Sequence, residues 1–144
     1  FPITDNRMTR FMISLEEGVK LVWHAFDDMK GGEIYVKKIS SMKVTDIALA
    51  VDENTKQEEV GIRPGEKLHE QMIGIEDALY TYEYPENFKI LPSINDWAKD
   101  EARIGDGIRV PEDFTYTSNN NKEWMEISEL KEWIKKNKSK IGNI

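Results

Sequence analysis

Short stretches of alternating apolar and polar positions mark the expected strands. Over residues 1–13 the apolar side chains stand at Phe1, Ile3, Met8, Phe11 and Ile13. This alternation predicts one or two brief strands with a turn at Asp5-Asn6. Residues 33–36 and 59–62 have the composition of two further short strands. Residues 81–85 and 88–92 predict the two strands of a hairpin that turns at Pro85-Glu86-Asn87.

Helical spacing appears in three places. Ser14 and Glu17 match a capping box, and the helix predicted after them ends at Gly31-Gly32. Its apolar positions are Val19, Val22, Trp23, Phe26 and Met29. Thr45 is a candidate cap for a second helix, and a third follows Ser128, with lysines gathered toward its C-terminal end where they suit the helix dipole. Residues 93–113 have the weakest periodicity and are expected to be mostly loop. The mixture predicts one domain, residues 1–144, of the mixed α/β (α+β) class.

Composition removes several classes of protein. The chain has 144 residues, and its 20 basic and 27 acidic residues give a net charge of −7, the wrong overall sign for a nucleic-acid binder. No apolar run approaches the ~20 residues that a membrane span needs, so no membrane partner is expected. The absence of cysteine excludes disulfides and thiolate metal sites and agrees with a cytoplasmic protein.

Searches for catalytic signatures fail. The sequence has no phosphate-loop motif, and Gly105-Asp106-Gly107 lacks the third glycine of a dinucleotide fingerprint. His69-Glu70 begins like a zinc-binding H-E-x-x-H motif, but Ile73 occupies the position of the second histidine. No serine lies in a G-x-S-x-G elbow. We therefore expect no catalytic centre, metal site or cofactor-binding site on this chain itself.

The most informative segment is residues 61–70, which contains Arg63-Pro64-Gly65-Glu66. Proline followed by glycine specifies a type II turn, which holds Arg63 and Glu66 at its corners. A guanidinium matches phosphate oxygens, and a nearby carboxylate accepts hydrogen bonds from ribose hydroxyls. The pair therefore suits a nucleotide better than a bare phosphate. The alternative is a surface ion pair between Arg63 and Glu66 on an ordinary turn.

Arg10 is a second candidate for binding an anion. It is flanked by positions that have the character of buried residues, in Met8-Thr9-Arg10-Phe11. Two arginines at one site would neutralise a diphosphate, which carries about two negative charges. The alternative is a strand-edge arginine whose aliphatic stem covers the core.

Five segments, in this order, carry a resemblance to a known family. They are Pro2–Phe11, Gly31–Val36, Ser41–Asp46, Gly61–Glu70 and Pro111–Ser118. Together they resemble the C-terminal half of the inverting UDP-N-acetylglucosamine 4,6-dehydratases, extended short-chain dehydrogenase/reductases of polysaccharide biosynthesis. The resemblance is weakest over residues 74–108 and after residue 134. The Gly61–Glu70 segment is specific to this group.

The resemblance implies a lyase in which bound NADP takes hydride from C4 of the sugar, water leaves across C5–C6, and hydride returns to C6 with inversion at C5. It implies that an NADP-binding Rossmann domain with the catalytic residues lies upstream of Phe1, so that this chain alone is inactive. The chain would supply the UDP-sugar half of the cleft, with Arg10 and Arg63 on the diphosphate and Glu66 on the ribose. It also implies a place in the pseudaminic acid pathway and a homo-oligomer when full length, a hexamer being one form.

Two rivals stay open at this point. One is a related UDP-N-acetylglucosamine dehydratase, either one that also epimerises C5, in capsule biosynthesis, or one that retains the configuration there. The other is a noncatalytic interaction module left by truncation. No role follows from the sequence for Lys67 or His69.

Overall fold

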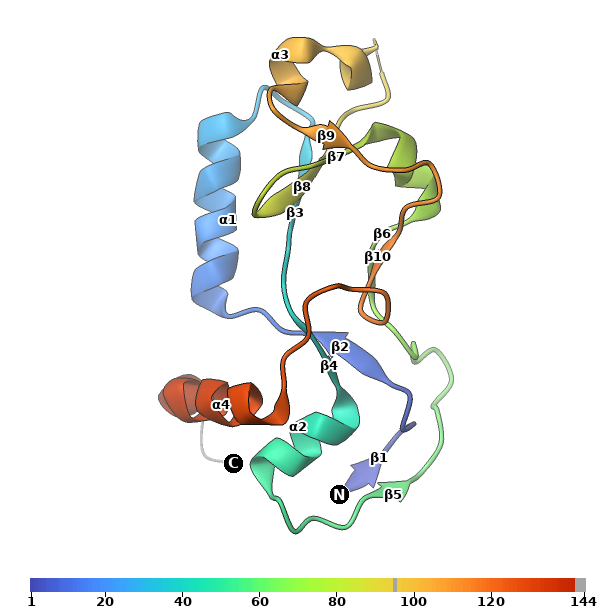
Figure 1. Ribbon diagram of the computed structural model, residues 1–144, viewed down its shortest axis with the longest axis vertical. Helices are drawn as coiled ribbons and strands as arrows, with labels where there is room; N and C mark the ends of the chain where they lie inside the picture. Colours follow the sequence, from blue (N-terminus) through green and yellow to red (C-terminus); the bar gives the residue numbers. More distant parts are fainter. Residues whose placement is uncertain (95, 142–144) are drawn as a thin grey trace. The chain divides into compact units, whose positions relative to one another are not determined.

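The computed structural model describes residues 1–94 and 96–141, and these residues form two compact units, each assembled from separate stretches of the chain (Figure 1). Unit 1 comprises residues 1–12, 40–70 and 118–144, and unit 2 comprises residues 13–39 and 71–117. Strands and helices occur in both units, which confirms the mixed α/β class.

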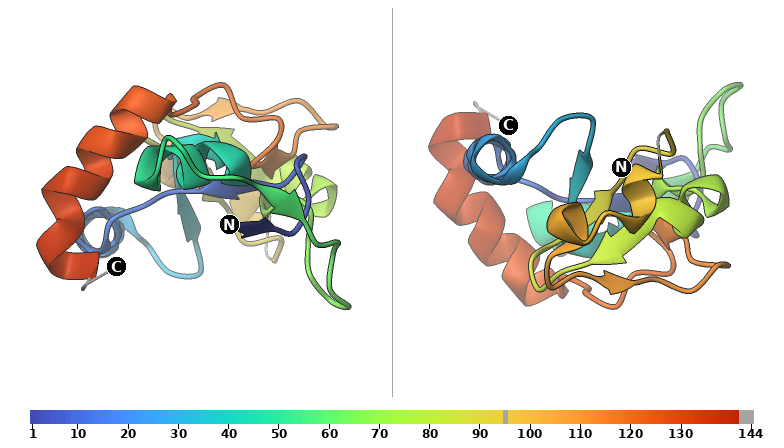
Figure 2. Two further views of the ribbon diagram at one scale, coloured as in Figure 1. Left: turned by 90° about the horizontal axis from the view of Figure 1, so that it is seen from below. Right: turned by 90° about the horizontal axis from the view of Figure 1, so that it is seen from above.

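Unit 1 consists of two small two-stranded sheets and two helices. Its elements are β1 (Pro2–Ile3), β2 (Thr9–Phe11), β4 (Ser41–Lys43), α2 (Val44–Val51), β5 (Glu58–Glu59) and α4 (Ile127–Ile141). β2 pairs antiparallel with β4, so that Arg10 stands opposite the fully buried Met42. β1 pairs in parallel with β5, and α2 packs against α4 (Figure 2). Apolar burial centres on Ile3, Met8, Met42, Ala48 and Leu130.

Unit 2 is built on a four-stranded antiparallel sheet with the strand order β3-β8-β7-β9. Its elements are α1 (Leu15–Asp28), β3 (Ile34–Lys37), β6 (Gln71–Ile73), the 3-10 helix η1 (Ile75–Tyr80), β7 (Thr81–Glu83), β8 (Asn87–Ile90), the 3-10 helix η2 (Trp97–Lys99), α3 (Glu101–Ile104), β9 (Ile108–Arg109) and β10 (Tyr116–Thr117). β10 pairs with β6, and the Phe88 ring lies 5.1 Å from Tyr116 and 5.2 Å from Phe114, between ring centroids. The hairpin predicted around Pro85-Glu86-Asn87 is confirmed as β7 and β8.

Helix α1 begins as the sequence predicts. The Ser14 hydroxyl accepts from Glu17 N, and the Glu17 carboxylate accepts from Ser14 N, which completes the capping box. The helix ends at Asp28, before the predicted Gly31-Gly32 stop. No residue of α1 is buried, and its whole predicted apolar stripe is exposed, including Trp23 at 64% and Phe26 at 65%.

Three sequence expectations need correction. Thr45 does not cap α2, because the helix begins at Val44 directly from the paired strand β4, and Lys43 occupies the cap position without a side-chain bond. The strand expected at 59–62 is limited to β5, because its partner β1 has only two residues. Residues 93–113 are not simply loop: they contain η2, α3 and β9, and the Asp100 carboxylate caps α3 by accepting from Ala102 N. Asn95 lies outside the described residues.

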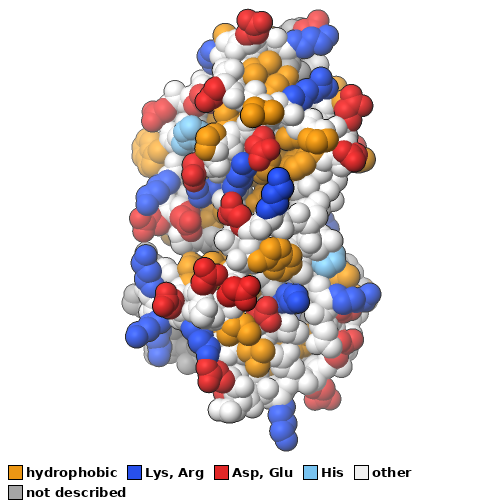
Figure 3. Space-filling model, viewed as in Figure 1, with side chains coloured by type: hydrophobic (Ala, Val, Ile, Leu, Met, Phe, Trp, Pro, Cys, Tyr) orange, Lys and Arg blue, Asp and Glu red, His pale blue; other side chains and the backbone are white. Residues whose placement is uncertain are grey.

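The described surface mixes charged and apolar side chains. Figure 3 shows basic and acidic side chains interspersed across the visible face, with smaller hydrophobic groups between them. No helix of the described chain has the length and apolarity to span a bilayer.

Candidate functional site

The turn at Arg63-Pro64-Gly65-Glu66 forms as predicted. The Glu66 amide donates to the Arg63 carbonyl at 3.0 Å, which closes the turn. Gly65 has a φ of +83°, the left-handed conformation that the third position of a type II turn requires. The turn belongs to unit 1 and lies in the segment that connects β5 to β6.

The two charged side chains of this turn do not pair with each other. The Glu66 carboxylate accepts instead from the backbone amide of Arg63, at 3.3 Å. Arg63 is exposed, and no residue in the described part of the chain forms an ion pair with its guanidinium. The turn therefore holds a half-buried carboxylate close to an arginine fork that can still bind an anion.

Arg10 is in a different position, because its guanidinium already has partners. Nη1 donates to the carbonyls of Thr9, at 2.8 Å, and Leu68, at 3.2 Å. Nη2 lies 2.9 Å from the Met8 sulfur, and Nε lies 3.9 Å from a Glu70 carboxylate oxygen. The side chain is 25% exposed. Arg10 thus connects β2 to residues 68–70, and any anion would have to compete with these partners.

Arg10, Arg63 and Glu66 all lie in unit 1, but they do not all contact one another. Arg63 and Glu66 share one turn, and Arg10 contacts Leu68 and Glu70, which belong to the same segment, Gly61–Glu70. No described contact connects Arg10 to Arg63 or Glu66.

Sequence reasoning missed a partly buried cluster beside Arg10, which we call the polar junction: Thr9, His69, Glu70 and Ser118. Thr9 Oγ1 lies 2.8 Å from His69 Nδ1 and 2.7 Å from Ser118 Oγ. Ser118 Oγ also accepts from the Glu70 amide at 2.9 Å, and the Ser118 amide donates to the Glu70 carbonyl at 2.8 Å. Ser118 is fully buried and Thr9 is 4% exposed.

The signal for the polar junction was present but could not be interpreted. Its residues lie in three of the five resembling segments, up to 109 positions apart. A threonine, a histidine and a serine that far apart carry no spacing that predicts a contact. Only the folded chain reveals that the segments meet through hydrogen bonds.

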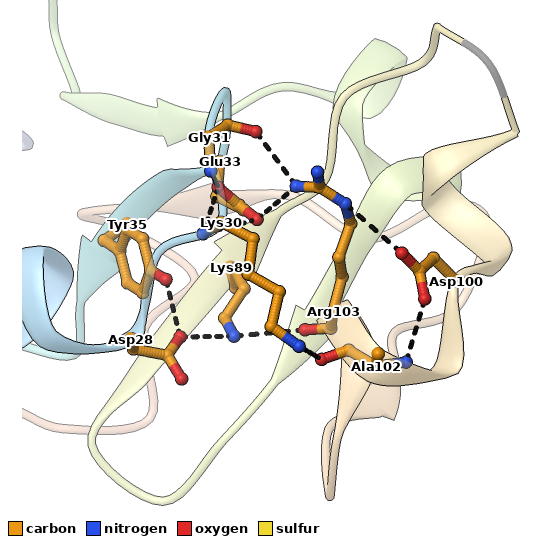
Figure 4. A network of polar contacts seen from close by, with 9 residues as sticks. All are labelled: Asp28, Lys30, Gly31, Glu33, Tyr35, Lys89, Asp100, Ala102 and Arg103. Carbon is orange, nitrogen blue, oxygen red and sulfur yellow. Dashed lines mark hydrogen bonds and ion pairs between the residues drawn. The ribbon is translucent and has the colours of Figure 1, made fainter.

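Unit 2 holds a second charged cluster, centred on Arg103 (Figure 4). Arg103 Nη1 donates to the Gly31 carbonyl at 2.9 Å and to the Glu33 carboxylate at 2.5 Å. Its Nε lies 3.4 Å from Asp100, and its guanidinium stacks 4.0 Å from the Trp97 ring centroid. The side chains of Arg103 and Glu33 are 9% and 2% exposed. Burial opposes ionisation of Glu33, but backbone amide hydrogen bonds and Arg103 outweigh it, so the pKa of Glu33 is lowered.

Lys89 connects this cluster to α1. Its ammonium lies 2.5 Å from the Asp28 carboxylate, donates to the Arg103 carbonyl at 3.2 Å and stands over the Tyr84 ring. Burial opposes ionisation of Asp28, yet hydrogen bonds from Lys89 and Tyr35 lower its pKa on balance. Burial, followed by the hydrogen bond to Asp28, raises the pKa of Tyr35. Asp28, Tyr84, Lys89 and Arg103 line a pocket of about 310 Å³, in which Lys89 is paired with Asp28 and Arg103 with Glu33.

The described residues do not fit a dinucleotide or a metal. The four-stranded sheet is antiparallel, and Gly105 and Gly107 follow α3 instead of opening a helix. A Cβ at Gly107 would lie 2.5 Å from the Tyr84 ring, so this glycine is explained by close packing. No group of three or more potential metal-ligating side chains occurs in the described part of the chain.

Comparison with known proteins gives a consistent result. A family model described as polysaccharide biosynthesis protein matches residues 1–92. The chain is 49% identical over 138 residues to UDP-N-acetylglucosamine 4,6-dehydratase (inverting) of Campylobacter jejuni, covering 92% of this chain and 41% of that relative. It is 32% identical over 138 residues to UDP-glucose 4-epimerase of Rickettsia rickettsii, covering 92% and 40%.

A solved structure shares the fold. The X-ray structure of Pen from Bacillus thuringiensis superposes with a TM-score of 0.72 and 28% identity, covering 94% of this chain and 39% of that one. The chain spans about two fifths of the length of these relatives. The resemblance seen in the five sequence segments is confirmed by the family match over residues 1–92, and the chain belongs to the polysaccharide biosynthesis protein family.

Proposed function

We propose that residues 1–144 form the UDP-sugar-binding domain of an inverting UDP-N-acetylglucosamine 4,6-dehydratase, a short-chain dehydrogenase/reductase that acts in nucleotide-sugar biosynthesis toward pseudaminic acid. One observation carries the proposal: the turn at 63–66 holds an exposed guanidinium without an ion-pair partner among the described residues, next to a carboxylate held by the backbone.

The chemistry of this turn matches the two parts of a nucleoside diphosphate. The Arg63 fork donates two parallel hydrogen bonds to phosphate oxygens. The Glu66 carboxylate, already accepting from one backbone amide, retains lone pairs for ribose hydroxyls. Arg10 adds a second positive charge for the diphosphate when its contacts with Glu70 and Met8 are exchanged for phosphate oxygens. Its Nη1 bonds to the two carbonyls hold the guanidinium in place meanwhile.

The relatives support the nucleotide part of this proposal. Both named relatives act on UDP-sugars according to their names, although one is a dehydratase and the other an epimerase. What they have in common is the UDP group, which is the part that Arg63 and Glu66 would bind. The 49% identity to the inverting dehydratase favours dehydration over epimerisation.

NADP would supply hydride transfer in the whole enzyme. The described residues do not fit a dinucleotide, so we assign NADP and the catalytic residues to a part of the protein outside residues 1–144. This chain's contribution is to bind and orient the substrate. The whole enzyme would be a cytoplasmic homo-oligomer.

The test is calorimetric titration of UDP into the chain and its Arg63→Ala variant. A charge-assisted hydrogen-bonded contact of about 1.5–3 kcal/mol predicts affinity weakened by about 10- to 100-fold. Arg63→Lys keeps the charge but loses the fork, so it restores only part of the affinity. Glu66→Gln weakens binding less than Arg63→Ala, because an amide oxygen still accepts from ribose.

Lys67→Ala is the matched control, because Lys67 is an exposed cation next to the turn. It should leave UDP affinity nearly unchanged, and thermal melting checks that every variant is folded. If a folded Arg63→Ala variant binds UDP as tightly as the parent, the turn is an ordinary surface turn and the proposal fails.

A second experiment tests whether NADP binding and catalysis belong to a part of the protein outside residues 1–144. The 144-residue chain should neither dehydrate UDP-N-acetylglucosamine nor bind NADP, because hydride chemistry needs the cofactor held against the sugar. Turnover above a protein-free control, or NADP binding in a fluorescence titration, would contradict it.

A further inference from the structure

Backbone hydrogen bonds within unit 1 fix the chain on both sides of the turn at 63–66. On one side the Val60 amide donates to the Ile3 carbonyl at 2.8 Å. On the other side the Leu68 carbonyl accepts from the Thr9 amide, at 3.2 Å, and from Arg10 Nη1. The turn therefore lies between one contact with β1 and another with β2.

The polar junction fixes this second contact. His69 follows Leu68 directly, and its Nδ1 contacts the Thr9 hydroxyl, while Glu70 contacts Ser118 through its amide and its carbonyl. The Glu70 carboxylate also accepts from the Phe11 amide, at 2.6 Å. Thr9 and Arg10 are neighbours in β2, and both donate to the Leu68 carbonyl. The contacts of the junction therefore lie beside Arg10 as well as beside the segment that leads to Arg63.

The hydrogen bonds of the polar junction can be satisfied with either tautomer of His69. The Thr9 hydroxyl has one proton, so it donates to one of His69 Nδ1 and Ser118 Oγ and accepts from the other. If His69 Nδ1 donates to Thr9, the Thr9 hydroxyl donates to Ser118 Oγ, and the Ser118 hydroxyl donates to the Thr9 carbonyl at 3.2 Å. If His69 Nδ1 accepts, Ser118 donates to Thr9 instead. A side chain at position 69 must therefore offer a donor or an acceptor at the place of Nδ1, and an apolar one leaves the buried Thr9 hydroxyl with one partner fewer.

We infer that His69 is a positioning residue for UDP binding: through Thr9 it fixes residues 68–70 to β2, and thereby sets the orientation of the Arg63–Glu66 turn and of Arg10. This inference rests on the proposed function and gives His69 a role that its own sequence position does not reveal. His69 touches no part of the ligand in this scheme.

The experiment measures UDP affinity and thermal stability for variants on both sides of the contact. His69→Ala and Thr9→Val each remove one partner and should weaken UDP binding about 3- to 10-fold, the range expected for one net hydrogen bond. His69→Asn offers amide groups near the place of Nδ1, and Thr9→Ser keeps the hydroxyl. Both should return the affinity to within about twofold of the parent.

The double variant Thr9→Val/His69→Ala should bind no more weakly than the worse single variant, because both changes remove the same contact. Lys67→Ala is again the control, since it alters the same segment without touching the junction. If His69→Ala fails to fold, the pair Thr9→Val and Thr9→Ser tests the same contact, because a loss of affinity is expected in Thr9→Val alone.

Two results would overturn the inference. One is a folded His69→Ala variant with parental UDP affinity. The other is a loss of affinity in His69→Ala that tracks a loss of melting temperature and that His69→Asn does not restore, which indicates general destabilisation. Failure of the proposed function looks different, because Arg63→Ala would then also leave UDP affinity unchanged.

Discussion

The turn at 63–66 and the cluster around Arg103 both contain an arginine close to a glutamate, yet they use the pair in opposite ways. In unit 2, Arg103 and Glu33 bond directly at 2.5 Å, and the guanidinium is further enclosed by Gly31, Asp100 and Trp97. In unit 1, the Glu66 carboxylate bonds to the Arg63 backbone and the Arg63 guanidinium extends into solvent.

The difference follows from local geometry. Arg63 and Glu66 are the corners of a tight turn, and the turn directs the carboxylate to the backbone amide. Arg103 comes from α3 and Glu33 from the residue before β3, so two distant segments are joined by their side chains. Removing one partner of an enclosed pair is costly, whereas an exposed fork adds little stability and remains available for a ligand.

Removal of the Arg103 side chain should have the largest effect. Arg103→Ala leaves the buried Glu33 carboxylate without its cation, and breaking a buried pair costs about 3–5 kcal/mol of unfolding free energy. Arg63→Ala should change this free energy by less than about 0.5 kcal/mol, as expected at an exposed position. Urea denaturation followed by circular dichroism measures both, and equal losses in the two variants would abolish the contrast.

Arg10 should fall between these extremes, because it is partly enclosed and partly available. Arg10→Ala removes the bonds to the Thr9 and Leu68 carbonyls, which predicts a loss of about 1–3 kcal/mol in unfolding free energy. It should also weaken UDP binding, which Arg103→Ala should not do in molecules that remain folded. Denaturation and UDP titration of the same preparations give the two values. A stability like that of the parent would mean that Arg10 is as free as Arg63.

Helix α1 extends the contrast to apolar side chains, since unit 2 encloses the Arg103–Glu33 pair yet leaves the apolar stripe of α1 exposed. Exposed apolar patches promote association. The isolated chain should therefore self-associate, and Trp23→Ser/Phe26→Ser should shift it toward monomer. Sedimentation velocity at several concentrations checks this, with the exposed Lys20→Ser as a control. A parent that stays monomeric at high concentration would contradict the prediction.

The smallest expected effect is a pH dependence that arises in unit 1. Hydrogen bonds from the Arg7 side chain, at 2.7 and 3.0 Å, and from its backbone amide lower the pKa of Asp5 from 3.8 to about 2. Because the folded-state pKa is the lower one, the stabilisation is complete above about pH 4 and disappears as the pH falls to about 2.

Asp5→Asn should therefore have a smaller loss of melting temperature between pH 4 and 2 than the parent. Arg7 is 73% exposed, so the difference should be small and reduced further by salt. Identical acid profiles for the two proteins would refute the assignment.

The local elements could largely be predicted from sequence where a short motif determines them. The Ser14–Glu17 capping box, the Pro85-Glu86-Asn87 hairpin and the Pro64-Gly65 turn each depend on interactions within a few residues, and all three formed as expected. Thr45 and residues 93–113 failed for the opposite reason. The start of α2 depends on the pairing of β4 with β2, and α3 is joined by an ion pair to Glu33, which lies far away in the sequence.

The candidate site shows the same limit. The turn chemistry identified Arg63 and Glu66, and their roles remain predictions. The partners of Arg10, and the polar junction as a whole, could not be foreseen, because a hydrogen bond across 109 positions leaves no local pattern. The exposed stripe of α1 illustrates the reverse error, since a helical apolar period indicates a face that can be buried and not one that is buried.

The interleaving of the two units has a consequence for how the chain is made. All residues of unit 2 lie between 13 and 117, whereas unit 1 needs residues 118–144 in addition to 1–12 and 40–70. During synthesis from the N-terminus, unit 2 can therefore complete its contacts first, whereas the hydrogen bond between Thr9 and Ser118 cannot form until Ser118 has been made. Contacts between such distant positions form slowly. The unit that presents Arg63 should consequently mature after unit 2 on the ribosome, and a chain stalled before residue 118 should hold a folded unit 2 and an incomplete unit 1.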